Sequence, residues 1–369
     1  MKKINRTAFW ASVIASIFIT GFVMNSYFAS QTEYAGGISQ ATNELQPSSE
    51  SSLPIEQPVT RIALAGPLAD ASAEVSGLAW YGDYLIILPQ YPHRMSESGD
   101  GVIYALHKAD ILAYLDGESS APLEPIAIML EAPGLRKKIS GYEGFEAIGF
   151  SANRAFLTIE GGEDHEIGED HGMMGYLVSG LMAPDMSKLV LDTGAIVPIE
   201  PQTKLGNKSD EALIVLDDRL VTFYEVNGVE FNPQPVAHVF SLDLQPQDTL
   251  LFPSLEYRLT DAALASDGNH FWVMNSLFLG DFDLRAESDP LADAFGRGPT
   301  HAKFDVVERL VEMQYEPTGI TLTSTAPIQL ELNFIAGNNW EGLVLLDERG
   351  FLLMTDKFPE TILGFVPMP

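Results

Sequence analysis

The chain has 369 residues, a formal net charge of −30 and no cysteine. The lack of cysteine excludes disulfide bonds, thiolate metal sites and a cysteine nucleophile, and the negative charge excludes a general affinity for nucleic acid or anionic lipid. The same charge favours cations as ligands, although general solubility is the simpler explanation for it.

The N-terminus is typical of an export signal. Lys2, Lys3 and Arg6 precede an apolar stretch over residues 8–24 that Ser and Thr interrupt. A positive flank followed by an apolar segment directs export. The segment is longer than a usual signal core and slightly short of a membrane span, and no clean cleavage site follows it. Residues 1–30 are therefore either a signal peptide or an uncleaved anchor. We expect a protein exported to the periplasm or beyond, touching the membrane only through this segment.

The next segment, residues 31–58, is rich in Ser, Gln, Glu, Thr and Pro. That composition is typical of a solvated tether. Residues 59–369 remain for a folded domain, and one β-rich domain commonly has such a length.

Five segments of this domain repeat one pattern: a small or acidic residue, a short apolar strand, a tight polar turn and a second apolar strand. Turns such as Gly82-Asp83 and Asp267-Gly268 between apolar runs are typical of β-hairpins. The repeats begin at Ser76, Glu143, Glu211, Ala262 and Glu341. Their spacing of roughly 50–80 residues leaves room for four strands in each repeat.

The repeats predict an all-β fold, a β-propeller of about five four-stranded blades. The last repeat has room for three strands only, and residues 61–64 have the character of the missing fourth. A strand from the N-terminus is therefore expected to close the ring, which also protects the sheet edges. A sixth blade within residues 300–335 is the alternative. A parallel α/β fold is disfavoured, because no long amphipathic helical pattern recurs between the strands.

In a propeller the first strands start, and the second strands end, on one face around the axis. The repeats place Ser76, Glu143, Glu211, Ala262 and Glu341 in the first group, and Gln90, Glu160, Glu225, Asn275 and Asp356 in the second. Carboxylates gathered in a shielded place raise each other's pKa unless a cation compensates them. Oxygen ligands suit Ca²⁺, so the sequence predicts this ion on the axis. The alternative is that the Glu-Gly pairs are turn residues whose carboxylates cap backbone amides.

The strand starts Ser76-Gly77-Leu78 and Glu143-Gly144, together with residues 338–343, resemble those of exported propellers of the phytase-like (esterase-like) family. The five-fold spacing is also similar to that of the soluble calcium-activated nucleotidases, whose propellers hold calcium on the axis through Glu and Ser side chains. This second resemblance implies a calcium shell made of Ser76, Glu143, Glu211 and Glu341. It leaves the fourth blade, with Ala262, without a side-chain ligand.

Further polar segments are expected on the same face. Residues 163–171 repeat Glu-Asp-His, so that His165 suits a second metal ion or general acid–base catalysis, while a solvated acidic loop is the simpler interpretation. Lys137, Lys138 and Arg258 lie just ahead of first strands, where they suit a phosphate or carboxylate ligand. Chance placement in polar loops is the alternative. Residues 277–300 are expected to form a loop over this face.

These features predict an exported, metal-dependent hydrolase with Ca²⁺ as cofactor, acting on a phosphorylated or ester small molecule. The proposed roles are metal binding for Ser76, Glu143, Glu211 and Glu341, proton transfer for Glu160 or His165, and anion binding for Lys137, Lys138 and Arg258. The alternative is a non-catalytic propeller that binds a protein or glycan and uses the ion only to fix the blades, since the fold hosts both functions. The sequence names no substrate and no oligomeric state.

Overall fold

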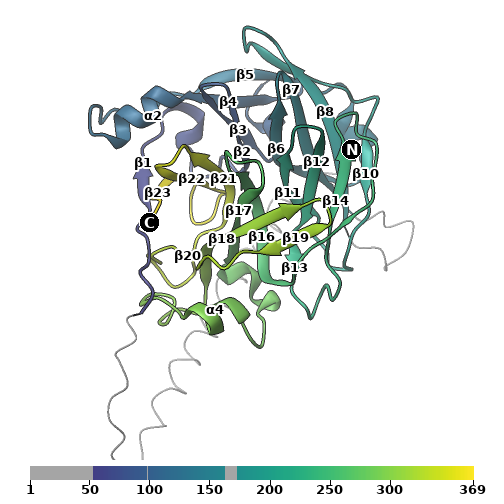
Figure 1. Cartoon of the computed structure of the whole chain (residues 1–369). Helices are drawn as coiled ribbons and strands as arrows, with labels where there is room; N and C mark the ends of the chain where they lie inside the picture. The colour runs from purple at the N-terminus through teal and green to yellow at the C-terminus, as the bar shows by residue number, and fades with distance from the viewer. Residues whose placement is uncertain (1–52, 98, 163–172) are drawn as a thin grey trace, which may run out of the picture. The chain divides into compact units, whose positions relative to one another are not determined.

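The computed structural model describes residues 53–97, 99–162 and 173–369, and over these ranges the chain is mainly β-sheet (Figure 1). The predicted export segment 1–30, the tether up to residue 52 and His165 with its acidic loop lie outside the described residues. Among the described residues, no helix is long and apolar enough to cross a membrane.

The described strands group into five four-stranded antiparallel blades. The first consists of β2 (Val75–Tyr81), β3 (Tyr84–Pro89), β4 (Val102–His107) and β5 (Ile126–Glu131). The second consists of β6 (Tyr142–Ser151), β7 (Arg154–Gly161), β8 (Met174–Met182) and β9 (Lys188–Leu191). The third consists of β11 (Asp210–Val215), β12 (Arg219–Tyr224), β14 (Val236–Ser241) and β15 (Leu250–Leu251). The fourth consists of β16 (Leu255–Leu264), β17 (His270–Leu277), β18 (Val307–Glu316) and β19 (Gly319–Leu322).

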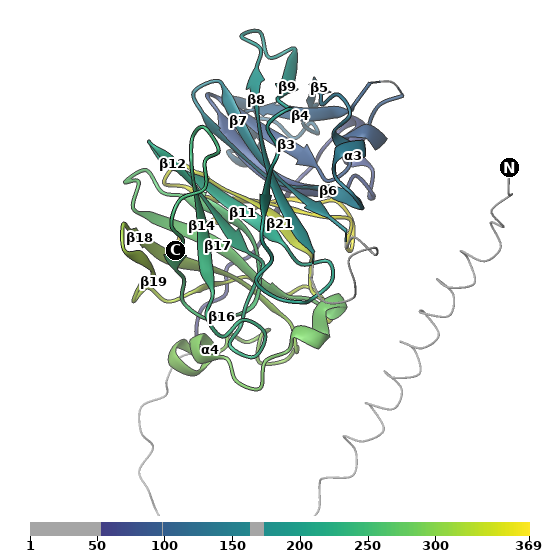
Figure 2. The same cartoon turned by 90° about the vertical axis from the view of Figure 1, so that its right-hand side faces the viewer.

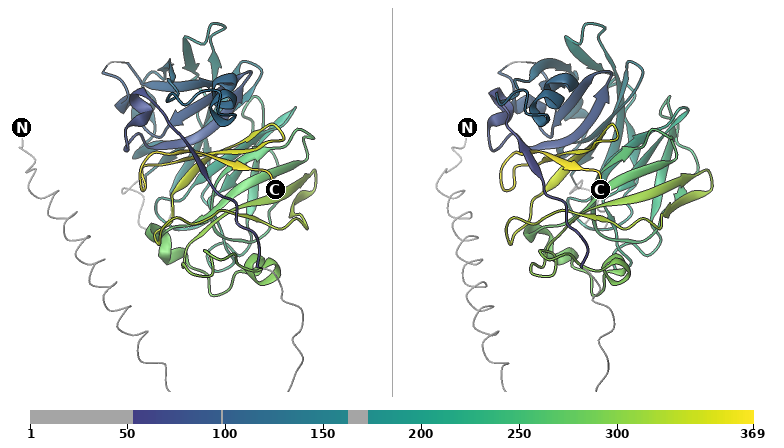
Figure 3. Two further views of the ribbon diagram at one scale, coloured as in Figure 1. Left: turned by 90° about the vertical axis from the view of Figure 1, so that its left-hand side faces the viewer. Right: turned by 60° about the vertical axis from the view of Figure 1, so that its left-hand side comes forward.

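The fifth blade takes its outer strand from the other end of the domain. It consists of β21 (Trp340–Leu346), β22 (Gly350–Thr355), β23 (Leu363–Pro367) and β1 (Thr60–Ile62). Thr60 pairs with Phe365, and Ile62 pairs with Leu363, in an antiparallel register. Figure 3 shows this purple strand running beside the yellow last blade. The pairing confirms the prediction that an N-terminal strand closes the ring.

The first strands of the five blades, β2, β6, β11, β16 and β21, contact one another in a closed cycle around the axis. Figure 2 shows β6, β11, β16 and β21 among them. Small residues allow this close approach. A Cβ on Gly77 would lie 3.2 Å from the backbone of Ala147, and one on Gly342 would lie 2.7 Å from Leu78. The residues that suggested a sixth blade, 300–335, instead supply β18, β19 and the short β20 (Ile328–Gln329) to the fourth.

The outer edges of neighbouring blades are joined. Met129 of β5 pairs in parallel with Lys188 of β9, and Leu251 of β15 pairs in parallel with Gly319 of β19. Two further short strands, β10 (Val197–Ile199) and β13 (Val226–Asn227), add to β8 and β16. These pairings occupy edges that would otherwise invite association with another chain.

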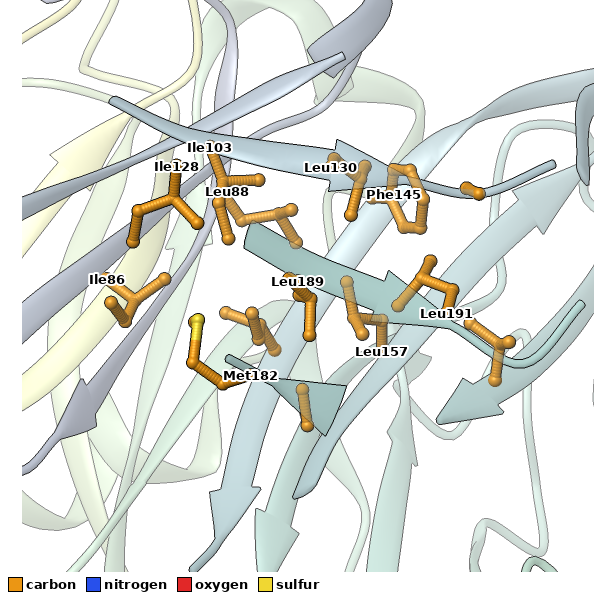
Figure 4. Packing of buried hydrophobic residues seen from close by; sticks show 14 of the residues in the cluster. Ile86, Leu88, Ile103, Ile128, Leu130, Phe145, Leu157, Met182, Leu189 and Leu191 are labelled. Carbon is orange, nitrogen blue, oxygen red and sulfur yellow. The ribbon is translucent and has the colours of Figure 1, made fainter. Parts of the chain in front are cut away.

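Apolar side chains fill the spaces between blades. In β3, Ile86 and Leu88 pack toward the second blade, whereas Leu85 and Ile87 pack toward the fifth. Figure 4 shows the first of these cores, between strands of the first two blades. Each blade lies between two others, which explains why its inner strands carry apolar side chains on both faces rather than on one.

Loops and short helices complete the domain. The helices are α2 (Lys108–Leu115), α3 (Leu135–Lys138), α4 (Pro290–Phe295), η1 (Gly66–Ala69), η2 (Pro92–Arg94) and η3 (Leu279–Leu284). Residues 53–58, which the sequence assigned to the tether, contact the propeller. Gln57 forms a parallel bridge with Leu330, and Glu56 accepts hydrogen bonds from the backbone and side chains of Thr300 and His301.

Candidate functional site around the propeller axis

Every inner hairpin carries one unpaired residue near the start of its first strand. Register shifts place these residues at Ser76, Glu143, Glu211, Thr260 and Glu341. The sequence placed Ala262 at the fourth position, and this was wrong by two residues. Thr260 brings a hydroxyl rather than a methyl group, but it donates to the carbonyl oxygen of Trp340 at 2.7 Å.

The second blade carries an additional acid at this level, Glu146. Counting back from the turns explains why. Tyr81 faces Tyr84 and Ser151 faces Arg154 across equivalent tight turns, and five residues before these positions stand Ser76 and Glu146. A second irregularity in β6, between Phe145 and Ile148, moves Glu143 outward. Glu146 is thus the neighbour of Ser76 in the ring, while Glu143 is only half-buried.

Buried acids from several blades surround the propeller axis, and we call them, with the cations that they contact, the axial cluster. Arg258 of β16 is the cation at its centre. Its side chain is 5% exposed, and its Nε donates to Glu225. The two remaining nitrogens contact four other side chains: Nη1 lies 3.1 Å from Asp281 Oδ2 and 2.6 Å from Asn339 Oδ1, and Nη2 lies 3.1 Å from Glu211 Oε2 and 3.3 Å from Glu341 Oε1. A guanidinium has five N–H groups. Arg258 therefore has no donor left for a substrate anion.

A second buried cation, Lys208, shares two of these acids. Its Nζ lies 3.2 Å from Glu225 Oε1 and 3.6 Å from Asp281 Oδ1. Asp281 belongs to η3, within the segment 277–300 that the sequence placed over this face. The contacts of Asp281 with Arg258 and Lys208 bring that segment onto the axis, as predicted.

On the side of the cluster nearest the first two blades, the buried acids have no cationic partner among the described residues. Glu146 and Glu160 are buried, and neither forms an ion pair among the described residues. Gln90 Nε2 lies 3.4 Å from Glu146 Oε1. Four buried oxygens here have no hydrogen-bond partner in the described part of the chain: Ser76 Oγ, Glu160 Oε1, Ser209 Oγ and Glu225 Oε2. Buried polar atoms are normally paired, so these oxygens are available to a water molecule, a cation or another ligand.

Burial raises the pKa of all the axial glutamates that show a shift. The pKa of Glu160 rises to about 7 because of desolvation and the negative charge of Glu225, which Lys208 only partly offsets. The pKa of Glu341 rises to about 8 through desolvation and the nearby Asp356. Desolvation also holds the pKa of Glu146 and Glu211 well above the usual range, with further contributions from Glu160 and Glu225 respectively.

The three cations predicted to bind an anion do not converge. Arg258 is on the axis and saturated, as described above. Lys138 donates to the carbonyl oxygen of Thr193 at 2.5 Å. Lys137 lines a separate cavity beside the axis.

The predicted calcium shell is also divided. Glu211 and Glu341 share the same nitrogen of Arg258, Glu143 is only half-buried, and Ser76 lies beside Glu146. In the part of the chain that the structure describes, no three His, Asp or Glu side chains are placed so that they could hold a metal ion. Buried oxygen atoms on Ser76, Glu160 and Glu225 have no hydrogen-bond partner among the described residues, and Glu146 has only the long contact with Gln90. Such oxygens are of the kind that a hard cation prefers as ligands.

Sequence reasoning missed Glu146 and Asp281 as members of the cluster. The position of Glu146 could have been predicted by counting back from the turn of its hairpin, because this places it at the same level as Ser76. Asp281 carried no such signal, because its position depends on how a long loop folds over the axis.

Comparisons with known proteins add little to this picture. Neither a family model nor a curated protein matches the sequence. Structurally the chain is similar to hydrazine synthase from Kuenenia stuttgartiensis, with 8% identity, a TM-score of 0.37 and coverage of 76% of this chain and 61% of that chain. It is similar to an exo-β-1,3-galactanase from Phanerochaete chrysosporium, with 8% identity, a TM-score of 0.43 and coverage of 85% and 64%. The chain thus spans less than two thirds of the length of these two proteins.

A third similar structure is an exo-1,5-α-L-arabinanase from a bovine ruminal metagenomic library, with 8% identity, a TM-score of 0.43 and coverage of 80% of this chain and 93% of that chain. Identities and TM-scores this low carry no argument about function. The propeller fold therefore rests on the strand pairing described above, and the resemblance to the phytase-like and nucleotidase families stays a prediction.

Proposed function

We propose that the axial centre is the active site of a cation-dependent hydrolase that acts on a phosphorylated or ester small molecule. The observation that carries this proposal is the group of buried, uncompensated carboxylates with unpartnered oxygens between the first three blades. Burying a carboxylate without a counter-charge lowers the stability of the fold. Such groups are retained where they bind a cation or transfer a proton.

Ca²⁺ is the proposed cofactor, held by Glu146 and Glu225 with the hydroxyl of Ser76. Bound there, it would supply a Lewis acid that polarises the substrate oxygen. Of the four calcium ligands expected from the sequence, this assignment retains only Ser76. It replaces Glu143, Glu211 and Glu341, because Glu143 is only half-buried and the other two contact Arg258.

Glu160 is the proposed proton-transfer residue. In the metal-free protein, desolvation and the charge of Glu225 raise its pKa to about 7, which is the direction that suits a general acid–base catalyst at neutral pH. In the carboxylate form it would accept a proton from the attacking water, and in the acid form it would return that proton to the leaving-group oxygen. The unpartnered Oε1 atom leaves Glu160 free to contact water or substrate.

The test is turnover of 4-nitrophenyl phosphate and 4-nitrophenyl acetate by the full-length protein, with EGTA and then with added Ca²⁺. We expect turnover that needs Ca²⁺ and a kcat about 100-fold lower in Glu160→Gln, which is the smaller end of the usual contribution of a general acid–base residue. Glu118→Gln, at an exposed position on the first blade, is the matched control and should keep the full rate. A Glu160→Gln variant as fast as the wild type would contradict the assignment.

A second candidate function is a non-catalytic propeller that binds a protein or glycan. The observation that favours it is the saturation of Arg258, which makes the axis a cross-link among three blades and the η3 loop. Binding of Ca²⁺ without turnover of any ester would support this function over the first.

A further inference from the structure

A cavity of about 480 Å³ lies beside the axial cluster, on the face where the first strands begin. It is formed by the loop after β3 and the connection from β5 to β6. Its polar and aromatic lining consists of His93, Asp100, Arg136, Lys137, Tyr142 and Phe145. Tyr142 also lies near Glu146, whose negative charge adds to desolvation in raising the pKa of the phenol. Tyr142 and Phe145 line the cavity and belong to β6, the strand that also carries Glu146.

Two cations in this cavity are not used by the protein itself. The side chains of Arg136 and Lys137 are exposed and form no ion pair or hydrogen bond within the described residues. Their neighbour Lys138 differs, since its ammonium group is bound to Thr193. Two adjacent free cations are unusual in a chain with a net charge of −30. Such a pair suits an anionic group with several oxygens, such as a phosphate or a carboxylate.

Aromatic rings form another part of the lining. The ring centroids of His93 and Tyr142 are 6.3 Å apart, and those of Tyr142 and Phe145 are 6.1 Å apart, each pair in an edge-to-face arrangement. A second polar group stands beside them. Asp100 uses Oδ2 to accept the backbone N–H of Ala132 at 2.8 Å, and its Oδ1 has no partner among the described residues. Aromatic faces pack against the C–H face of a sugar ring, and a free carboxylate oxygen accepts a sugar hydroxyl.

We propose that this cavity binds an acidic sugar, with its anionic group on Arg136 and Lys137, a hydroxyl on Asp100 and its ring against His93 and Tyr142. The inference rests on the proposed function, because it names the substrate class of the neighbouring axial centre. Both a sugar phosphate and a sugar carboxylate have the required chemistry. The size of the cavity suits one or two sugar rings.

The test is isothermal titration calorimetry of the full-length protein in EGTA with glucose 6-phosphate, glucuronate, glucose and inorganic phosphate. At least one acidic sugar should bind at least tenfold more tightly than either glucose or phosphate, and the one that binds identifies the anionic group. The double variant Arg136→Ala/Lys137→Ala and the single variant His93→Ala should each weaken that binding about tenfold or more. Lys303→Ala removes an exposed cation outside the cavity and should bind as the wild type does.

Binding of neither acidic sugar, or equal binding by the double variant, would overturn the inference. Inorganic phosphate binding as tightly as glucose 6-phosphate would overturn the part that concerns the sugar ring. The two measurements separate this inference from the proposed function, since calorimetry in EGTA reports sugar binding without turnover. Binding in the calorimeter without turnover of any ester would remove the proposed function alone, and Ca²⁺-dependent turnover without sugar binding would remove the inference alone.

Discussion

Replacing Arg258 with methionine is expected to lower the free energy of unfolding by about 3–5 kcal/mol, the usual effect of removing one partner from a buried ion pair. The substitution leaves Glu211, Glu225, Glu341 and Asp281 facing one another with Lys208 as the only cation described in contact with them. Those side chains come from the third blade, the fifth blade and the η3 loop, so the loss of their common partner acts on the ring itself. Urea denaturation at pH 7.5 measures the change.

The matched control for Arg258→Met is Arg349→Met. Arg349 is half-exposed and forms a bidentate ion pair with Asp116 on the surface, at 2.6 and 3.1 Å. Exposed pairs contribute about 0–1 kcal/mol, so this variant should lie close to the wild type. Equal, small effects in both variants would show that the axial cluster is not held together by its guanidinium.

The stability of the metal-free protein is expected to increase by several kcal/mol as the pH falls from 8 to 5, since each pKa unit corresponds to about 1.4 kcal/mol. The carboxyl groups of Glu160, Glu308 and Glu341 have folded-state pKa values of about 7, 7 and 8, raised in each case mainly by burial. Between the unfolded pKa of 4.5 and these values, the folded state binds more protons than the unfolded state. Stability therefore falls as the pH rises through this window.

Histidines change how steeply the free energy of unfolding depends on pH, but not the direction of that dependence. Desolvation lowers the pKa of His301 and His93, which opposes the gain below about pH 6.5. The pKa of His238 is raised, because Asp210 outweighs the effect of burial, and it acts in the same direction as the carboxyls. Urea denaturation in EGTA at pH 5, 6, 7 and 8 measures the trend. Glu341→Gln should make the free energy of unfolding depend less on pH between pH 7 and 8, whereas Glu118→Gln should not. A free energy of unfolding that rises with pH would contradict the burial of these groups as acids.

Local turn chemistry made the blades predictable. Gly82-Asp83 and Asp267-Gly268 each join two apolar strands in the structure, as expected, because a tight turn fixes which strands pair. The closing strand near residue 61 was also predictable, since a four-stranded repeat leaves the last blade one strand short.

The register around the axis was only partly predictable. Single unpaired residues in the first strands shift every position after them, which is why Ala262 was assigned in place of Thr260 and why Glu146 was passed over. The role of Arg258 could not be predicted at all. The sequence placed a cation beside acids, but its partners lie 23 to 83 residues away along the chain and meet it only through the closed ring.

The most direct test of the cation-binding centre is the thermal unfolding midpoint of the full-length protein at pH 8, measured in EGTA and then in excess Ca²⁺. A ligand that binds only the folded state raises the midpoint, by about 2.7 kcal/mol of stability at a concentration 100 times its Kd. We predict such a rise for the wild type and for Glu118→Gln, and its loss in Glu146→Gln, which removes the charge of a proposed ligand. No rise in the wild type, or an equal rise in Glu146→Gln, would contradict a Ca²⁺ site on the propeller axis.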